Sequence, residues 1–436
     1  MLAALRRFRF TEFQLLVVPS LMAIVGLLTV FLNRTGSAQW TWSDIWISLA
    51  YVVLLFGITG WLSLSGFKGD QVLFPIVAML VGLGLLIMQR LQPVLEAKGG
   101  AWATLAQRQL IYLALGLGLF WGMMTFVRSL DWLRRYKYTW AFAGLALMAV
   151  TIVLGREEYG ARSWLDLGIV TVQPDEIVKL ILVVFMAGYL DEHRAAIGST
   201  YRLGPLSLPP IPYLLPMGLM WLMAVATVVL QNNLGSALLF FGIFLVMLYV
   251  ATGRQVYVVV GLASFAVAVY IAYQLFGRIG DRVQNWIDPW ADPWVLGNQQ
   301  IQSDYAMAAG RMFGVGLGNG FPQFIPVVET DYVFAVIGEE LGFLGTMGVL
   351  CLYLLLVGRG FLIALRAEDG FARLLAAGLT TILALQTLII LGGVVRLIPL
   401  TGVTLPFISA GGSSLLTNFI IVALLLRTSD PEWRRG

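Results

Sequence analysis

The residues best suited to chemistry lie where a long polar segment meets an apolar one. Residues 278–330 are polar and rich in glycine, and they end in Glu329, Thr330 and Asp331 as a hydrophobic run begins. A carboxylate at such a junction can act as a general base on a hydroxyl group. It can equally cap a helix, because its oxygens accept the free N–H groups of the first turn. Position alone leaves both roles open for Asp331.

Other charged residues lie inside the apolar runs. Glu176 and Lys179 are three residues apart, so on a helix they share a face and can neutralise each other. A lone charge at mid-membrane costs about 2.5 to 3.5 kcal/mol on insertion scales, so such groups are paired or line a cavity. Glu339 and Glu340 follow Asp331 by about two turns, and at least one must point inward. For both sets, a structural ion pair and a functional site remain open.

Two more residues are ambiguous at this level. Arg162 and Trp164 lie in the connection before Glu176, where a tryptophan is either an ordinary interfacial anchor or part of a site. His193, the only histidine, lies beside acidic and basic residues in another connection and is interpreted as a solvated loop residue.

Composition determines the class of protein that must position these residues. The 436 residues are 59% hydrophobic and 12% charged, with a mean hydropathy of +0.84, which excludes an ordinary soluble fold. We therefore predict an all-α polytopic membrane protein with about twelve transmembrane helices. The candidate ranges are 13–32, 43–64, 71–89, 108–128, 138–154, 176–190, 213–230, 235–252, 256–277, 331–358, 374–394 and 404–426.

Charge distribution predicts the orientation of these helices. With both termini cytoplasmic, 17 of the 28 Lys and Arg residues fall on the inner side and 10 outside, with Lys179 inside a helix. The segments 155–175, 278–330 and 395–403 then face outward. The net charge of +4 therefore reports membrane topology, and no nucleic-acid partner is predicted.

Other signals limit the chemistry. Cys351 is the only cysteine, so an intramolecular disulfide is excluded, and no segment has the ligand density of a dedicated metal site. We identify no cofactor, although assistance from a divalent cation stays open. The predicted organisation is a two-helix extension at 1–69 without intramembrane charge, a membrane core at 70–427 and a short cytoplasmic tail at 428–436.

Five sequence blocks, in order along the chain, carry a family resemblance. The blocks are Gly160 to Trp164 with Gln173 to Lys179; Gln231 to Gly235; Asp292 to Ala306; Thr330 and Asp331 with Gly338 to Gly342; and Pro399 to Ser414. With these blocks the chain resembles the SEDS family (shape, elongation, division and sporulation), typified by RodA and FtsW. The run Arg396 to Gly402 is closer to the RodA type. Asp175 stands where the family usually has Ser, Asn233 where it has Asp, Ala410 where it has Tyr and Glu329 where it commonly has His.

The resemblance implies a peptidoglycan glycosyltransferase that polymerises lipid II on the outer face of the bacterial cytoplasmic membrane, in cell elongation and shape maintenance or in division. It implies Asp331 as the catalytic base of an inverting displacement. Cations would stabilise the leaving diphosphate, and Arg162, Lys179, Arg282 and Arg311 are the candidates. The expected substrate-binding residues are Arg162, Trp164, Glu176, Lys179, Arg282, Gln299, Gln302, Ser303, Thr330, Glu339 and Glu340.

The resemblance also implies partners: a class B penicillin-binding transpeptidase, lipid II and membrane lipids. The glycines of 278–330 predict a movable loop, with Gln302 and Ser303 facing substrate. Two alternatives remain. A flippase for lipid-linked precursor would use a similar cavity without needing a base, and a scaffold for other wall-synthesis enzymes would need no chemistry.

Overall fold

The structure is a computed structural model. It describes residues 9–32, 42–96, 104–127, 129–158, 161–166, 171–198, 201–203, 206–208, 211–231, 233–275 and 277–430. Gly160 and Asn232 of the family blocks lie outside these ranges.

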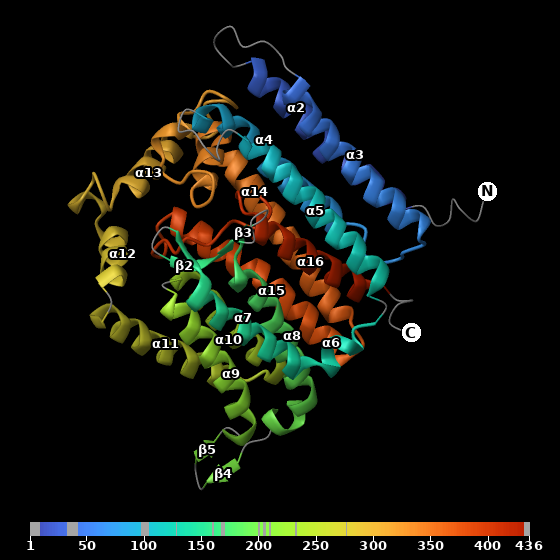
Figure 1. Ribbon diagram of the computed structural model, residues 1–436, viewed down its shortest axis with the longest axis vertical. Helices are drawn as coiled ribbons and strands as arrows, with labels where there is room; N and C mark the ends of the chain where they lie inside the picture. Colours follow the sequence, from blue (N-terminus) through green and yellow to red (C-terminus); the bar gives the residue numbers. More distant parts are fainter. Residues whose placement is uncertain are drawn as a thin grey trace.

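Helices occupy all twelve predicted ranges (Figure 1). They are α2 (Phe10–Leu32), α3 (Trp42–Leu64), α4 (Leu73–Glu96), α5 (Leu105–Phe126), α7 (Lys137–Leu154), α8 (Pro174–Gly198), α9 (Ile211–Leu230), α10 (Leu234–Thr252), α11 (Gln255–Leu275), α14 (Val333–Arg366), α15 (Gly370–Val394) and α16 (Gly412–Ser429). Among the described residues, ten of these helices are long and apolar enough to cross a membrane. The other two are α8 and α11. The all-α polytopic class is confirmed, and the count of twelve spans stays a prediction.

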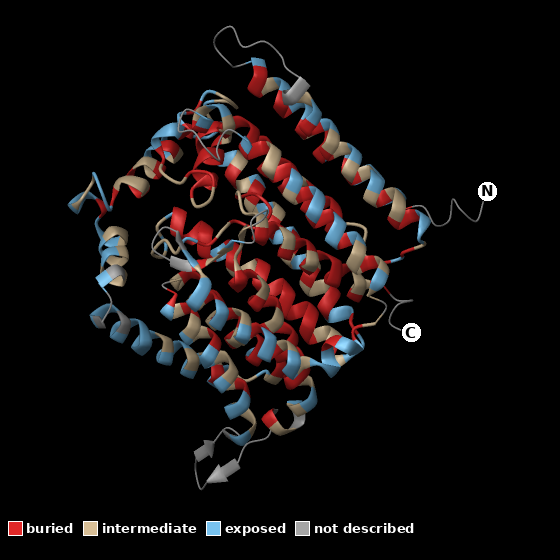
Figure 2. Ribbon diagram, in the orientation of Figure 1, coloured by how far each residue is buried: buried red, intermediate tan, exposed pale blue. Residues whose placement is uncertain are grey.

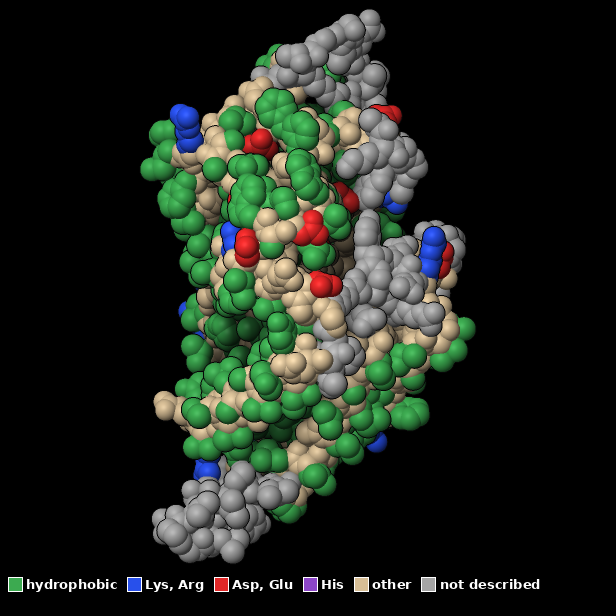
Figure 3. Space-filling model, turned by 90° about the vertical axis from the view of Figure 1, so that its left-hand side faces the viewer, with side chains coloured by type: hydrophobic (Ala, Val, Ile, Leu, Met, Phe, Trp, Pro, Cys, Tyr) green, Lys and Arg blue, Asp and Glu red, His purple; other side chains and the backbone are tan. Residues whose placement is uncertain are grey.

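The bundle is built around α15, which packs against α8, α10, α14 and α16. Figure 2 shows buried residues concentrated in α4, α15 and α16, whereas α11 is exposed along most of its length. Figure 3 shows that hydrophobic side chains cover most of the face that carries α11 to α13. Acidic side chains gather in its upper half, at the level of α12 and α13, as expected for the end of the bundle that meets water.

The predicted outer segments gather at one end of the bundle. The backbone N–H of Gln173 donates to Ser413 Oγ at 3.0 Å, and Arg282 Nη1 donates to the carbonyl of Thr401 at 3.3 Å. At the opposite end, the N–H of Asp70 donates to Ser429 Oγ at 2.8 Å. The direction in which this bundle crosses the membrane remains a prediction.

The connections contain structure that the hydropathy pattern does not predict. Three short strands, β1 (Arg156–Glu158), β2 (Ala161–Asp166) and β3 (Thr171–Val172), form an antiparallel sheet before α8, and β4 (Tyr201–Leu203) pairs with β5 (Leu206–Leu208). A short helix, α6 (Asp131–Arg135), precedes α7. The long segment 278–330 is largely folded into α12 (Gly277–Ile287), α13 (Asn298–Gly310) and two 3₁₀ turns, Pro289–Ala291 and Pro322–Phe324.

Helix α14 is kinked at Gly342, whose φ of 69° favours glycine. A Cβ there would lie 2.2 Å from the backbone N of Gly314, so the close approach also requires glycine. Segment 311–316 supplies the hydrogen bonds that the helix lacks at the kink. Two of its N–H groups donate to the carbonyls of Glu339 and Glu340, and two of its carbonyls accept from N–H groups just past the kink, at 2.9 to 3.1 Å. The glycine-rich segment is therefore docked on α14.

Two helix starts differ from the sequence-based ranges. α16 begins at Gly412 instead of 404, because residues 404–411 form a turn in which Phe407 has a φ of 69°. α2 begins at Phe10, which places Glu12 in its first turn. The sequence-based range starts at residue 13 and leaves out Glu12, which is fully buried within α2. The expectation that the first two helices carry no charge inside the membrane stays a prediction.

Arg9 neutralises this carboxylate and joins the N-terminal pair of helices to the core. Its Nε donates to Glu12 Oε2 at 2.8 Å, and its Nη atoms donate to the carbonyls of Phe67, Gly69 and Asp70 at 2.6 to 3.2 Å. Thr59 of α3 adds a hydrogen bond to Glu12 Oε1 at 2.9 Å. The start of α2 is thereby fastened to the chain that leads into α4.

We expect Arg9→Met to destabilise the protein by about 3 to 5 kcal/mol, because it leaves the buried Glu12 charge without its partner. The double variant Arg9→Met/Glu12→Leu should recover part of this loss. Denaturant unfolding of the purified protein in detergent measures both. Arg359→Met, which removes a more exposed ion pair with Asp70, is the control and should cost less than about 1 kcal/mol. A loss that small for Arg9→Met would contradict the assigned role.

Candidate functional site

A cavity of about 350 Å³ lies between α12, α13 and the connection that follows α15. It is open to the outside and has a mixed polar and apolar lining. Its residues are Asp281, Arg282, Asn285, Trp286, Val295, Leu296, Gln299, Gln300, Asp331, Ile398, Leu400 and Gly402. Three residues proposed from the sequence, Asp331, Arg282 and Gln299, therefore meet in one cavity although they are up to 49 positions apart in the sequence.

Asp331 lies just before α14, and two chain segments hold it there. Its backbone N–H donates to the carbonyl of Val327 at 3.2 Å, closing a tight turn. The carbonyls of Glu329 and Thr330 accept hydrogen bonds from Ala410 N, at 2.9 Å, and from Ser409 Oγ. Thr330 thus supports the aspartate through its backbone, and the turn before α16 fixes the position of the carboxylate.

The environment of Asp331 makes it a weaker acid than an exposed aspartate. Burial raises its pKa to about 6, because the charged form loses hydration, while a hydrogen bond from Thr330 and the charge of Arg282 lower it. Gly402 lies beside the carboxylate, since a Cβ there would be in ordinary contact at 3.7 Å from Asp331 Oδ2, and its φ of 74° is a conformation that favours glycine. A carboxyl group with this pKa is largely ionised at neutral pH and can still accept a proton.

Gln302 and Ser303, expected to face substrate, do not line this cavity. They lie on α13 one turn from Gln299, and Ser303 is fully buried with no hydrogen-bond partner for its hydroxyl among the described residues. Gln299 and Gln300 line the cavity instead. Gln300 also donates to Asp304 at 2.9 Å and to the carbonyl of Val394 at 3.1 Å.

Glu339 and Glu340 lie outside the cavity and hold the glycine-rich segment. Glu340 is fully buried, and its Oε1 accepts from Arg90 Nε of α4 at 2.9 Å. Its Oε2 accepts the N–H of Gly318 at 3.0 Å, and Glu339 Oε1 accepts the N–H of Phe321 at 3.0 Å. Both carboxylates therefore have structural contacts, and their expected contact with substrate stays untested.

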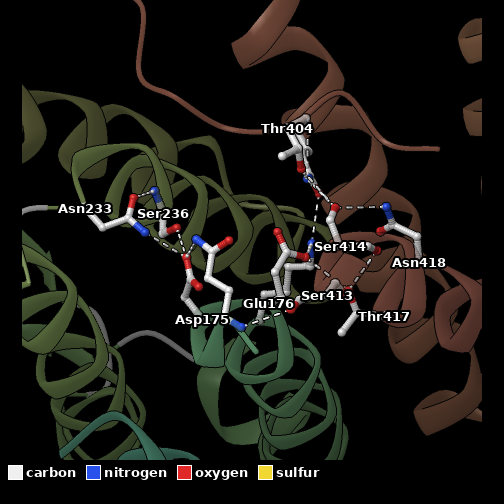
Figure 4. Close-up of polar contacts among 12 residues, drawn as sticks. Asp175, Glu176, Asn233, Ser236, Thr404, Ser413, Ser414, Thr417 and Asn418 are labelled. Carbon is white, nitrogen blue, oxygen red and sulfur yellow. Dashed lines mark hydrogen bonds and ion pairs between the residues drawn. The ribbon is translucent and has the colours of Figure 1, made fainter. Parts of the chain in front are cut away.

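Glu176 and Lys179 form a buried ion pair between α8, α15 and α16. Lys179 Nζ also donates to Gln386 Oε1 at 2.9 Å, and Thr417 Oγ1 donates to Glu176 Oε2 at 3.1 Å. Gln386 in turn donates to the carbonyl of Thr404 at 3.0 Å. Figure 4 shows this network running from α8 to the chain before α16. Through Gln386 the pair thus holds the segment 401–404, whose Gly402 lines the Asp331 cavity.

Asp175 and Asn233, two of the departures from the family pattern, contact each other (Figure 4). Asn233 Nδ2 donates to Asp175 Oδ2 at 2.8 Å, and Ser236 also donates to this carboxylate. The carboxylate that the family usually carries at position 233 is therefore supplied from position 175. The same carboxylate lines a small cavity of about 20 Å³, together with Glu176 and Lys179.

The remaining candidates lie apart from Asp331. Trp164 lies on β2 and is partly buried, and the side chain of Arg162, on the same strand, lies outside the described residues. Arg311 lines a different, mainly apolar cavity of about 470 Å³ between α13, α14 and α15. No group of three His, Cys, Asp or Glu side chains in the described part of the chain is placed to hold a metal ion.

Sequence reasoning missed Asn285, Trp286 and Gln300 as cavity residues. The signal was available in part: Asn285 and Trp286 follow Arg282 by three and four residues, so one helical face presents all of them. The spacing is informative only if residues 277–287 are known to form a helix, and their polar sequence predicts a loop instead.

The Glu176–Lys179 pair should show strong coupling. We expect Glu176→Gln and Lys179→Met each to destabilise the protein, and their double-mutant cycle to give a coupling energy of about 0.5 to 3 kcal/mol in unfolding experiments. The Lys137–Glu192 pair, in which Glu192 is half exposed, is the matched control and should be close to additive. Additivity within about 0.5 kcal/mol at Glu176 and Lys179 would show that they act independently.

The comparisons with known proteins concern nearly the whole chain. A family model described as cell cycle protein, for FtsW, RodA and SpoVE, matches residues 71–432. "Peptidoglycan glycosyltransferase RodA" of Mycobacterium tuberculosis is 39% identical over 433 residues, covering 98% of this chain and 91% of the relative. "Stage V sporulation protein E" of Bacillus subtilis is 33% identical and covers 83% and 96%.

Solved structures of similar chains point to the same family. A chain from a study of the structural coordination of polymerization and crosslinking by a peptidoglycan synthase complex is 31% identical, with a TM-score of 0.66, covering 83% of this chain and 98% of that one. The rod shape determining protein RodA of Thermus thermophilus is 29% identical, with a TM-score of 0.59 and coverage of 82% and 96%. The chain belongs to the SEDS family, the family of FtsW, RodA and SpoVE.

Proposed function

We propose that this protein is a peptidoglycan glycosyltransferase that polymerises lipid II into glycan strands, with Asp331 as its general base. The observation that carries the proposal is a carboxylate with a raised pKa beside an arginine in an open cavity at one end of a membrane bundle. The names of the mycobacterial relatives support the reaction class.

The proposed step is a single displacement. Asp331 removes the proton from a hydroxyl group of the acceptor sugar. The hydroxyl oxygen attacks the anomeric carbon of the donor, and the bond between that carbon and the diphosphate oxygen breaks. The diphosphate leaves as an anion with the lipid. One carboxylate suffices and no covalent sugar intermediate forms, so configuration inverts at the anomeric carbon.

Arg282 is the cation we assign to the leaving diphosphate. It lines the cavity with Asp331, whereas Lys179 is committed to Glu176 and Arg311 lies in another cavity. A guanidinium presents several donors in a fixed plane, which suits the oxygens of a diphosphate. Because Arg282 Nη1 donates to the carbonyl of Thr401, its head group is oriented before substrate binds.

The setting of this reaction follows from the same proposal. We place the cavity on the outer face of the bacterial cytoplasmic membrane, where lipid II is consumed, and assign the protein to elongation and shape maintenance or to division. The expected partner is a class B penicillin-binding transpeptidase; a similar chain has been solved in a peptidoglycan synthase complex. The scheme requires no cofactor, and an EDTA series would measure any assistance from a divalent cation.

We expect Asp331→Asn and Asp331→Ala to lower the polymerisation rate by about 100- to 10,000-fold, because each removes the general base. The assay follows glycan strands made from purified lipid II by the purified protein, with and without the transpeptidase. Unchanged melting profiles would serve as the folding control. Residual activity above about one tenth in both variants would eliminate the assignment. A flippase would leave both variants able to translocate precursor in vesicles, with no polymer formed by the wild type.

The second expectation concerns pH. Since Asp331 must be ionised to act as a base, activity should fall as pH drops through about 6. The positive charge of Arg282 favours the ionised carboxylate, so Arg282→Ala should raise the pKa and move the acid limb of the pH profile to higher pH. Arg282→Ala should also slow turnover by about 100-fold or more. Arg311→Ala is the matched control: an equal displacement of its acid limb would contradict a local effect of Arg282.

A further inference from the structure

Arg396 connects the elements that enclose the Asp331 cavity. It follows the end of α15 directly and has a φ of 60°, an uncommon conformation for a residue with a side chain. Its guanidinium is about one third exposed and does not line the cavity. The conformation belongs to the turn that ends α15, in which the N–H groups of Arg396 and Leu397 donate to the carbonyls of Gly393 and Gly392, at 3.2 and 2.8 Å. Glycine is the usual residue at this position of such a turn, so a role for the Arg396 side chain rests on its own contacts.

The contacts of Arg396 reach the two helices that cover Asp331. Its Nη2 donates to the carbonyls of Trp286 and Ile287, at 3.1 and 3.4 Å, and these are the last two residues of α12. The last carbonyls of a helix lack partners within the helix and attract a cation. Its Nη1 lies 3.4 Å from Asp304 Oδ2 on α13. One side chain therefore ties α12 and α13 to the end of α15.

Trp286 and Arg396 exchange hydrogen bonds in both directions. Trp286 Nε1 donates to the backbone carbonyl of Arg396 at 2.9 Å, while Trp286 accepts from the Arg396 guanidinium through its own carbonyl. This fixes both the helix end and the indole ring, which lines the cavity. Arg282 lies one helical turn earlier on α12, so the orientation of α12 decides where its guanidinium points.

α12 needs such an attachment. It follows α11, which is exposed along most of its length, and in Figure 1 both run along the edge of the bundle. Side-chain hydrogen bonds link it to the cavity floor, through Arg282 with Thr401 and through Trp286 with Arg396. α13 is held separately, because it packs along α14. The Arg396 contacts therefore tie the C-terminal end of α12 to the end of α15.

We infer that Arg396 is a positioning residue for the transfer reaction: it holds α12 against the end of α15 so that Arg282 and Trp286 face Asp331. The inference rests on the proposed function, and it adds a determinant that contacts neither the carboxylate nor the cavity. A displacement of about 1 Å at a reacting group can cost about 100-fold in rate, so a constraint on α12 is sufficient to control turnover.

The test compares substitutions that separate the guanidinium from the backbone. Arg396→Gly suits the left-handed conformation and removes the side chain, so the turn after α15 should keep its path. Arg396→Lys keeps the charge and loses the planar fork. Asp304→Asn removes the ion pair with α13 alone. Arg156→Ala, in a surface ion pair with Asp166 at 3.8 Å, is the control and should be neutral.

Two measurements are made on each variant. Spin labels at Thr104→Cys, at the start of α5, and Gln284→Cys, on α12, report the position of α12 by pulsed distance spectroscopy in a Cys351→Ser background. Steady-state polymerisation of lipid II separates kcat from KM. We expect Arg396→Gly to broaden or displace the distance distribution and to lower kcat by about 10- to 100-fold with a smaller change in KM. Arg396→Lys should change the distance distribution and kcat less than Arg396→Gly does. Asp304→Asn should change both by a still smaller amount.

An unchanged distance distribution in Arg396→Gly would overturn the inference, whether or not kcat falls, since a fall without movement would mean a direct contact with substrate. A distribution that changes while kcat stays within twofold of the wild type would also overturn it. Failure of the wild-type protein to polymerise lipid II would instead reject the proposed function, because the distance measurement does not depend on activity.

Discussion

Polar groups inside an apolar bundle must find their partners within the protein, because lipid offers no hydrogen bonds. This constraint explains the contacts that organise the fold. Arg9 pairs with Glu12 and three backbone carbonyls, Arg90 pairs with Glu340, and Lys179 pairs with Glu176. Arg90 joins α4 to α14, Arg9 joins the start of α2 to the chain before α4, and Lys179 reaches Gln386 of α15. The charges buried in this membrane protein therefore serve as fixed points of its architecture.

The same constraint positions the candidate base. Opening α14 at Gly342 exposes peptide groups, and these are satisfied by the glycine-rich segment that leads back to Asp331. The peptide groups of Glu329 and Thr330 are satisfied by the turn before α16. Asp331 is consequently held from both sides by backbone contacts, which leave its carboxylate available to the cavity. Its raised pKa is a direct result of this partly enclosed position.

Much of the fold could be predicted from the sequence, since long apolar runs indicate helices directly. Asp331, Arg282 and Gln299 could also be proposed, because they lie in recognisable blocks. The partners could not: Arg90 lies 250 positions before Glu340, and no local spacing indicates that contact. The late start of α16 could be predicted in part, because Pro406 and the pair Gly411–Gly412 are turn signals, although residues 404–411 are apolar enough to be taken as part of the helix. Segment 278–330 was interpreted as a loop because its helices are short and polar.

The turn before α16 has a consequence for biosynthesis. Ser409 and Ala410, which hold the peptide groups next to Asp331, are made about 80 residues after the aspartate and lie just ahead of the last helix. A chain still being inserted into the membrane carries Asp331 before it carries these partners. The carboxylate of Asp331 therefore acquires its final environment only when α16 has emerged and packed. Incomplete chains that escape into the membrane lack a formed site, so maturation of the enzyme is tied to completion of its synthesis.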